Sequence, residues 1–490
     1  MNSEKKKPST HERWAHLRFS VVGPLLAAPP KHGELQAELE RLAAKSWLHP
    51  LTGEPTRFGL SSIERWYYQA RKARLDPVAE LRRKVRKDIG RLNIVDPVKD
   101  MLRAQHAAHK SWSYQLHYDN LRAHLAANPA LGKLPSYSTV RRWMKSAGLM
   151  RSRKLAGLAT PGERAAQARL EAREVRSYEN PYVNGLWHLD FHHGKQGVLT
   201  SAGAYELPLA MGVLDDFSRL CCHLQWYLAD GESAEDLVHG LSQACQKRGL
   251  PRSLMSDGGA GMKAAEFRQG LARLGITHQM TLPKSPYQNG KQENFWAQLE
   301  GRLMAMLENV PDLTLAALNE ATQAWVELEY NRKVHSETGE TPLQRYLSGK
   351  SVGRPCPSSE TLRLAFCDEV VRTQRQSDGT FTLNGQRFEV PSRFRHLERV
   401  VVRYASWDLS RVHLVDDRTG TVLDRLFPLD KTANADGLRR AVEPIESSAS
   451  TDSSVPPAAA VPPLLAKLLD ELAATGLPPA YLPKDERKKR

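Results

Sequence analysis

Three carboxylates stand out because of the segments that carry them. Asp190 lies within an apolar, strand-like stretch at 186–192, where a buried charge is costly unless something compensates it. Asp257 ends a second apolar stretch and is followed by two glycines that allow a sharp turn. Glu293 lies beside, rather than opposite, the apolar stripe of a later helical pattern. Converging carboxylates suit hard divalent cations, and two such ions can promote phosphoryl transfer.

Each of these carboxylates also has an ordinary structural interpretation. Asp190 fits a hydrogen-bonded strand aspartate, and Asp257 fits a turn cap. Glu293 fits the preference of acidic residues for helix N-termini, which the helix dipole favours. It is the combination of two strand aspartates with a later helical glutamate that favours a metal-dependent site over three separate explanations.

The region around these carboxylates alternates strands and helices. Three consecutive strands with short connections, followed by strand–helix alternation, predict a mixed sheet flanked by helices. The expected strands are 186–192, 206–214, 220–227, 253–256 and 275–280, and the expected helices are 232–248, 262–274, 286–310 and 314–331.

Two helical units precede this region. The first, within 1–95, has a helix, a turn rich in Pro and Gly, and a second helix whose capping box would begin at Ser61. The second, at 96–150, ends in a helix for which Ser138 is the expected N-cap. Both units resemble helix-turn-helix DNA readers, whose second helix enters the major groove. The basic side of a single helix usually just faces solvent, so the prediction of DNA binding depends on the occurrence of two such units in tandem. The residues expected to contact DNA are Arg65, Arg71, Lys72, Arg141, Arg142 and Lys145.

The remaining segments complete a multidomain chain. We expect a basic linker at 151–183, the catalytic α/β core at 184–350 and a small β-barrel at 363–430, where Asn384-Gly385 marks a hairpin. A disordered Ser/Pro/Ala-rich linker at 431–462 and an amphipathic tail at 463–490 follow.

Charge is distributed unevenly along the 490 residues. Residues 1–180 contain 34 Lys and Arg against 17 Asp and Glu, whereas the remaining residues contain 36 against 38. All of the net charge of +15 therefore comes from the first third, and phosphate backbones attract such a surface.

Composition also excludes several classes of protein. None of the five cysteines precedes residue 221 and no C-x-x-C pair occurs, which argues against a disulfide scaffold or a cysteine-based zinc site. No apolar run has the length of a membrane span, and no signal peptide is recognisable. We expect a soluble, intracellular protein.

The core resembles the catalytic domain of the retroviral-integrase superfamily, the DDE transposases and integrases with an RNase H-like fold. The matching stretches are WHLDFHH at 187–193, LDDFSR at 214–219, MSDGG at 255–259, SPYQNGKQEN at 285–294 and YNRKVHSETGETP at 330–342. Residues 258–292, 35 in number, separate Asp257 from Glu293, a spacing typical of this family. The flanking helical units and barrel resemble the phage-Mu-like branch.

The resemblance implies a transposase that acts on DNA in the bacterial cytoplasm, where it cleaves 3′ ends and transfers strands. Asp190, Asp257 and Glu293 would bind two Mg²⁺ ions, with Mn²⁺ as a substitute. Asp215 and Asp216 match a motif that is not catalytic, so we interpret them as structural. His192 and His193 are candidates for phosphate contact, although packing or solvation is the commoner role of such histidines. Three further residues are expected to position DNA, with a solvated loop as the alternative: Lys284, Asn289 and Lys291.

Two other functions stay open. One is a sequence-specific DNA-binding regulator whose core has lost catalysis, and the other is a nuclease with an RNase H-like fold. A transposase must bring two DNA ends together, so we expect a homo-oligomer on DNA. The leucines of the tail predict docking to a partner, by resemblance an AAA+ ATPase, or else folding back onto the barrel.

Overall fold

The computed structural model describes residues 9–73, 75–82, 94–150, 179–281, 290–429, 461–476 and 480–484. The chain divides into two compact units, Met1–Asn93 and Ile94–Arg490. The expected basic linker at 151–183 and the expected disordered stretch at 431–462 lie almost entirely outside the described residues. No helix among the described residues is long and apolar enough to cross a membrane.

The first unit is a small helical body with one hairpin. Its elements are α1 (Thr10–Ala27), α2 (Leu35–Ala44), α3 (Leu60–Lys72), α4 (Pro77–Glu80) and the paired strands β1 (Trp47–Leu48) and β2 (Pro55–Thr56). Helices α2 and α3 occupy the positions that the sequence predicts. Val21, Val22, Leu39, Ile63 and Trp66 contribute to its core.

Two features of this unit differ from the expectations. Helix α1 was not anticipated, because Gly23 and Pro24 interrupt its helical pattern near the C-terminal end. The residue at the N-cap of α3 is Gly59 and no side chain caps that end, so the capping box expected at Ser61 is wrong.

The second unit begins with three helices, α5 (Asp96–Ala108), α6 (Tyr114–Ala127) and α7 (Tyr137–Ser146), with a 3-10 turn, η1 (Pro129–Leu131), between the last two. The side chain of Ser113 caps α6. The N-cap of α7 is Ser136, whose hydroxyl accepts a hydrogen bond from the amide of Thr139, so the expectation of Ser138 was two residues off.

A five-stranded mixed sheet follows, as the sequence predicts, and its strand order is β7-β6-β3-β8-β9. Its strands are β3 (Leu186–His193), β6 (Leu209–Asp215), β7 (Cys221–Tyr227), β8 (Ser253–Ser256) and β9 (Thr277–Met280). Strands β3, β6 and β7 pair antiparallel, whereas β3, β8 and β9 pair parallel. A small hairpin, β4 (Val198–Leu199) with β5 (Tyr205–Glu206), lies between β3 and β6.

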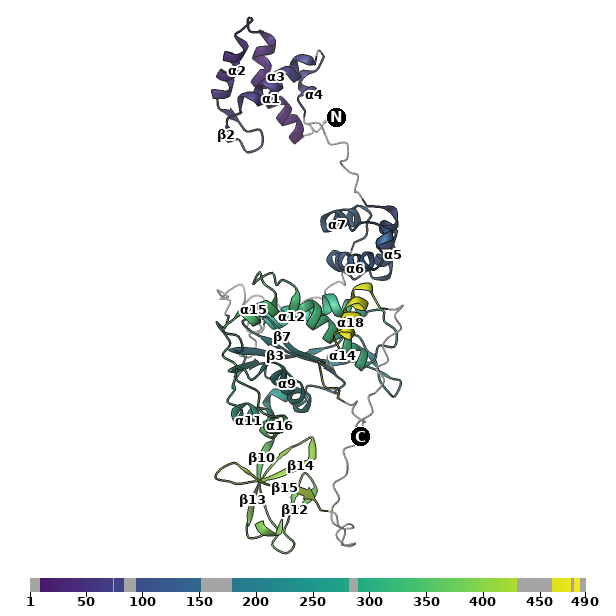
Figure 1. Cartoon of the computed structure of the whole chain (residues 1–490), viewed down its shortest axis with the longest axis vertical. Helices are drawn as coiled ribbons and strands as arrows, with labels where there is room; N and C mark the ends of the chain where they lie inside the picture. The colour runs from purple at the N-terminus through teal and green to yellow at the C-terminus, as the bar shows by residue number, and fades with distance from the viewer. Residues whose placement is uncertain are drawn as a thin grey trace, which may run out of the picture. The chain divides into compact units, whose positions relative to one another are not determined.

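Helices cover both faces of this sheet (Figure 1). One face packs on α9 (Ala234–Arg248) and α11 (Ala265–Arg273), and the other packs on α12 (Gly290–Leu299) and α14 (Leu315–Ala324). Successive residues of β6 alternate between the two cores, which explains why this strand is apolar from Leu209 to Leu214. Shorter elements complete the region: α10 (Ala260–Lys263), η3 (Glu300–Met304), α13 (Ala305–Leu307), η4 (Trp325–Glu329), η5 (Tyr330–Arg332), α15 (Pro342–Ser348) and α16 (Ser359–Ala365).

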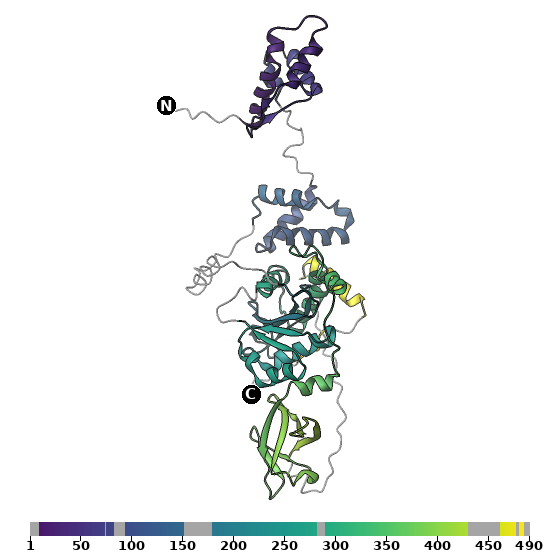
Figure 2. The ribbon, with the colours of Figure 1, turned by 90° about the vertical axis from the view of Figure 1, so that its left-hand side faces the viewer.

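The expected small barrel is a six-stranded antiparallel sheet in the order β10-β13-β14-β15-β12-β11, which curls toward closure (Figure 2). Asn384 and Gly385 both have positive φ, as the two-residue turn between β11 and β12 requires. The strands are β10 (Asp368–Thr373), β11 (Thr380–Leu383), β12 (Gln386–Glu389), β13 (Arg399–Ala405), β14 (Asp408–Val415) and β15 (Val422–Pro428). The turn η6 (Ser392–Phe394) precedes β13.

The amphipathic tail forms α18 (Pro463–Ala474), and its apolar face is already covered. Leu464, Leu465 and Leu468 are buried in one cluster with residues of α6 and α14 (Figures 1 and 2). The side-chain oxygen of Asn120, on α6, accepts a hydrogen bond of 3.0 Å from the amide of Leu464 and so satisfies one of the free amides in the first turn of α18.

Beyond α18, the backbone of Leu482 bonds to Gln225 and Gln243, and Lys484 pairs with Glu235 and Asp236. The tail therefore folds back onto the second helical unit and the α/β core. The premise of an uncovered leucine stripe was wrong, and so was the alternative of packing on the barrel.

Candidate active site

Asp190 lies in the middle of β3, at the centre of the sheet. Its Oδ1 accepts a hydrogen bond of 3.0 Å from the amide of Phe191, and its Oδ2 accepts one of 3.0 Å from the indole nitrogen of Trp296 on α12. Burial raises the pKa of the Asp190 carboxyl to about 6, the bond from Trp296 opposes this rise, and the charges of Asp257 and Glu232 add to it.

Asp257 reaches the same place from the neighbouring strand. Strands β3 and β8 are parallel, and Leu189 lies opposite Ser256. Asp190 follows Leu189 and Asp257 follows Ser256, so the two aspartates occupy adjacent positions on neighbouring chain segments of the sheet. The carboxylate of Asp257 accepts a hydrogen bond of 3.0 Å from the amide of Gly259. The two strand aspartates expected from the sequence are therefore brought together.

A third carboxylate near this pair was not anticipated. Glu232 immediately precedes Ser233, the N-cap of α9. A Cβ added at Gly259 would lie 2.1 Å from a Glu232 oxygen and 3.2 Å from an Asp257 oxygen, so both carboxylates lie close to this glycine. Burial raises the pKa of Glu232, Asp257 raises it further, and His193 lowers it. A lone acid before a helix gives no sequence signal of this kind.

Glu293 lies in the first turn of α12, and its side chain is exposed. It is three residues before Trp296, so the two side chains leave neighbouring positions on one face of the helix. The helix that covers Asp190 therefore also carries Glu293. Among the described residues, however, no group of three or more His, Cys, Asp or Glu side chains is close enough to hold a metal ion.

The donor set nevertheless suits Mg²⁺. Asp190, Asp257 and Glu293 offer only carboxylate oxygens, which hard divalent cations prefer. The crowding of negative charge around Asp190 helps to raise its pKa, and a divalent cation would relieve that crowding. The side chains present therefore fit the metal, although the structure gathers two of the three expected ligands and leaves Glu293 exposed.

The histidines beside Asp190 have protein partners. The ring of His192 stacks on Trp296, with centroids 5.0 Å apart, and its Nε2 lies 2.8 Å from a carboxylate oxygen of Glu300. His193 is exposed and contributes its charge to the surroundings of Glu232. For His192, packing is thus the role that the contacts display.

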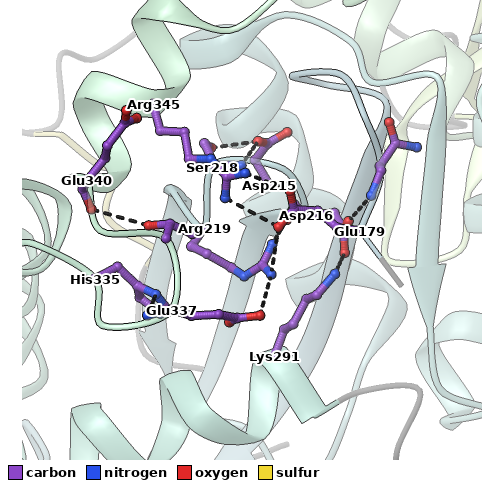
Figure 3. Close-up of polar contacts among 12 residues, drawn as sticks. Glu179, Asp215, Asp216, Ser218, Arg219, Lys291, His335, Glu337, Glu340 and Arg345 are labelled. Carbon is purple, nitrogen blue, oxygen red and sulfur yellow. Dashed lines mark hydrogen bonds and ion pairs between the residues drawn. The ribbon is translucent and has the colours of Figure 1, made fainter. Parts of the chain in front are cut away.

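Asp215 and Asp216 are buried in a network at the end of β6 (Figure 3). Asp215 accepts hydrogen bonds from the amides of Asn184 and Ser218 and from the Ser218 hydroxyl. Asp216 contacts His188 at 2.6 Å, the amide of Asn180 at 2.6 Å, and the ammonium of Lys291. These contacts agree with the structural interpretation of both aspartates.

Arg219 continues the same network (Figure 3). It adopts a positive φ of 64° and pairs with Glu179 at 3.1 Å and Glu337 at 3.2 Å. Arg345 also binds Glu179. The LDDFSR and YNRKVHSETGETP stretches noted in the sequence therefore meet around a single buried guanidinium.

The residues expected to contact DNA fall into three groups. Arg65, Arg71 and Lys72 on α3, and Arg141, Arg142 and Lys145 on α7, are all exposed. Lys284 and Asn289 lie outside the described residues. Lys291 is largely buried, and its ammonium is paired with Asp216.

The mixed sheet, with helices on both faces and two aspartates at its centre, forms an α/β domain. Residues 181–286 match the family model described as "Integrase core domain", and this match supports an integrase-type function. No curated protein matches the sequence.

Several solved integrases are similar. The HTLV-2 integrase catalytic core domain in complex with magnesium is 19% identical, over 35% of this chain and 100% of that one, with a TM-score of 0.28. The simian T-cell lymphotropic virus intasome in complex with PP2A regulatory subunit B56 gamma is 15% identical, over 68% and 96%, with a TM-score of 0.32. The BIV integrase catalytic core domain is 22% identical, over 34% and 94%, with a TM-score of 0.26.

Proposed function

We propose that this protein is a DDE transposase that cleaves the 3′ ends of a mobile element and joins them to target DNA. The observation that carries the proposal is the convergence of Asp190 and Asp257 at adjacent strands of an integrase core domain, beneath a helix that bears Glu293. The exposed basic helices α3 and α7 supply the means to recognise DNA ends.

In this proposal Asp190, Asp257 and Glu293 hold two Mg²⁺ ions, which would activate the attacking oxygen and stabilise the charge that develops on the leaving 3′ oxygen. The chain itself orients the ligands. The indole of Trp296 and the amide of Phe191 fix the two oxygens of Asp190, and the amide of Gly259 fixes Asp257. Catalysis then depends on positioning and charge rather than on a covalent intermediate with the enzyme.

The test is a strand-transfer assay with Mg²⁺ on DNA that carries the element's ends. Asp190→Asn, Asp257→Asn and Glu293→Gln each remove a charged ligand while nearly preserving shape. We expect each to reduce cleavage and joining to background while DNA affinity is retained. Asp417→Asn, in an exposed turn of the barrel, is the matched control and should behave as wild type.

The same assay separates the two alternative functions. A regulator without catalysis would bind the ends yet show no cleavage in the wild-type protein. A nuclease would cleave without joining. Robust strand transfer by any of the three carboxylate variants would refute the assignment of that residue.

Assembly and partners are part of the proposal. Two DNA ends must meet, so we propose a homo-oligomer on DNA. An AAA+ ATPase was expected to dock on the leucine face of the tail, but that face is buried in α18's packing on α6 and α14. An ATPase partner would therefore have to bind elsewhere on the chain.

A further inference from the structure

The first two turns of α12 are held on the sheet by three side chains. The Lys291 ammonium is paired with the carboxylate of Asp216. The Gln292 amide donates to the carbonyl of Gly212 at 3.4 Å, and the Trp296 indole donates to Asp190 at 3.0 Å. Because Glu293 lies between these anchors, they determine where its backbone stands relative to the two strand aspartates.

The anchor at Asp216 is itself rigid. Asp216 is 1% exposed and accepts hydrogen bonds from His188 and from the amide of Asn180, both at 2.6 Å. Burial alone would raise the pKa of Asp216, but these bonds and the one from Lys291 bring it down to about 2. A buried carboxylate that stays ionised needs a compensating cation, and Lys291 supplies one.

The sheet surface under α12 is shaped for close approach. Gly212 on β6 is directly opposite Asp190 on β3. A Cβ at Gly212 would lie 2.6 Å from the Trp296 ring and 3.2 Å from the Gln292 amide nitrogen. Two side chains of the helix thus fill the space that a side chain at position 212 would need, and a change in the anchoring of the helix would displace Glu293.

The geometry points to Lys291 as a positioning residue, whose ion pair with Asp216 holds the start of α12 so that Glu293 can complete the site formed by Asp190 and Asp257. This inference rests on the proposed function, because it gives Lys291 a role in presenting Glu293. It also replaces the sequence-based expectation that Lys291 contacts DNA, since its side chain is only 17% exposed and faces a carboxylate.

Lys291→Met and Asp216→Asn in the full-length protein test the inference. Each removes one charge of the pair, and Asp216 is too deeply buried to touch DNA. Strand transfer is measured at saturating DNA while Mg²⁺ is varied. We expect the maximal rate to fall about 10- to 100-fold in both variants, since a displacement of about 1 Å at a catalytic group has effects of that size. The Mg²⁺ concentration for half-maximal rate should rise, and the double variant should lose no more than either single one.

DNA affinity at several salt concentrations distinguishes positioning from DNA contact. A lysine that binds phosphate would, when removed, weaken binding and reduce the slope of log affinity against log salt by about 1. We expect an unchanged slope. Lys291→Arg, which keeps the charge, should recover part of the rate, and thermal melting sets an assay temperature at which every variant is folded.

Lys247→Met is the matched control. Lys247 is another largely buried lysine, on the helix at the opposite face of the sheet, where it contacts His223 at 3.1 Å. It should leave the Mg²⁺ response unchanged. The inference is overturned if Lys291→Met keeps the wild-type rate and the wild-type Mg²⁺ response. It is also overturned if more DNA fully restores the rate of this variant and the slope of log affinity against log salt is reduced. Activity in Glu293→Gln would instead overturn the proposed function.

Discussion

The junction between α6 and the α/β core contains a histidine that makes its stability sensitive to pH. His117 is 1% exposed, and neither ring nitrogen has a hydrogen-bond partner among the described residues. It packs beside Trp112, whose indole donates to the carbonyl of Ala305 in the core at 2.8 Å. Burial lowers the pKa of His117 to about 3, with smaller contributions from the charges of His106 and His109.

The sign and size of the effect follow from that shift. The unfolded chain takes up a proton at this histidine as the pH falls below about 6.5, whereas the folded chain does so only near pH 3. The contribution of neutral His117 to the unfolding free energy is therefore fully present above pH 6.5 and is lost as the pH falls toward 3. At pH 5, which is about 1.5 units below the unfolded pKa, the loss is about 2 kcal/mol, because each unit corresponds to about 1.4 kcal/mol.

His117→Leu isolates this contribution, because other depressed histidines, such as His239, remain in both proteins. At pH 7 the variant should be at least as stable, since unpaired buried nitrogens are unfavourable by about 1–3 kcal/mol. At pH 5 the difference in unfolding free energy should grow by about 2 kcal/mol in its favour. Denaturant melts followed by tryptophan fluorescence measure both values. Parallel pH profiles of the two proteins would refute the reasoning.

Two other predictions address the tail and the second basic helix. Leu465→Ala, at a residue 0% exposed on α18, should lower the unfolding free energy by about 2–5 kcal/mol in denaturant melts, whereas Lys467→Ala on the exposed side should not. An effect below about 0.5 kcal/mol would contradict the packing of α18. Replacing Arg141 or Lys145 by Ala should weaken binding to element ends in fluorescence anisotropy. If the side chain binds one phosphate, its removal should also reduce the slope of log affinity against log salt by about 1. Unchanged affinity in both variants would remove α7 from the DNA-binding surface.

The sequence determined the elements whose signals are local. Apolar periodicity located the five strands and four helical regions of the core, and Asn384-Gly385 located a hairpin. Two strand aspartates flanked by apolar residues were recognisable, because an ionisable group in a buried strand is an exception that the pattern exposes. The main local failures are α1, which Gly23 and Pro24 interrupt near its C-terminal end, and the N-caps of α3 and α7. At those two N-caps, neighbouring glycine or serine residues leave the helix start ambiguous.

Only the tertiary structure decided which distant groups meet. An amphipathic stripe requires that one face be buried but does not say against what, and so α18 was assigned to a partner although α6, over 300 residues earlier, covers it. Likewise, the charge of Lys291 fits a phosphate or a carboxylate equally well until the fold brings Asp216 to it. Glu232 joins the acidic pair for the same reason: Coulomb interactions depend on distance in space, which the order of residues along the chain does not fix.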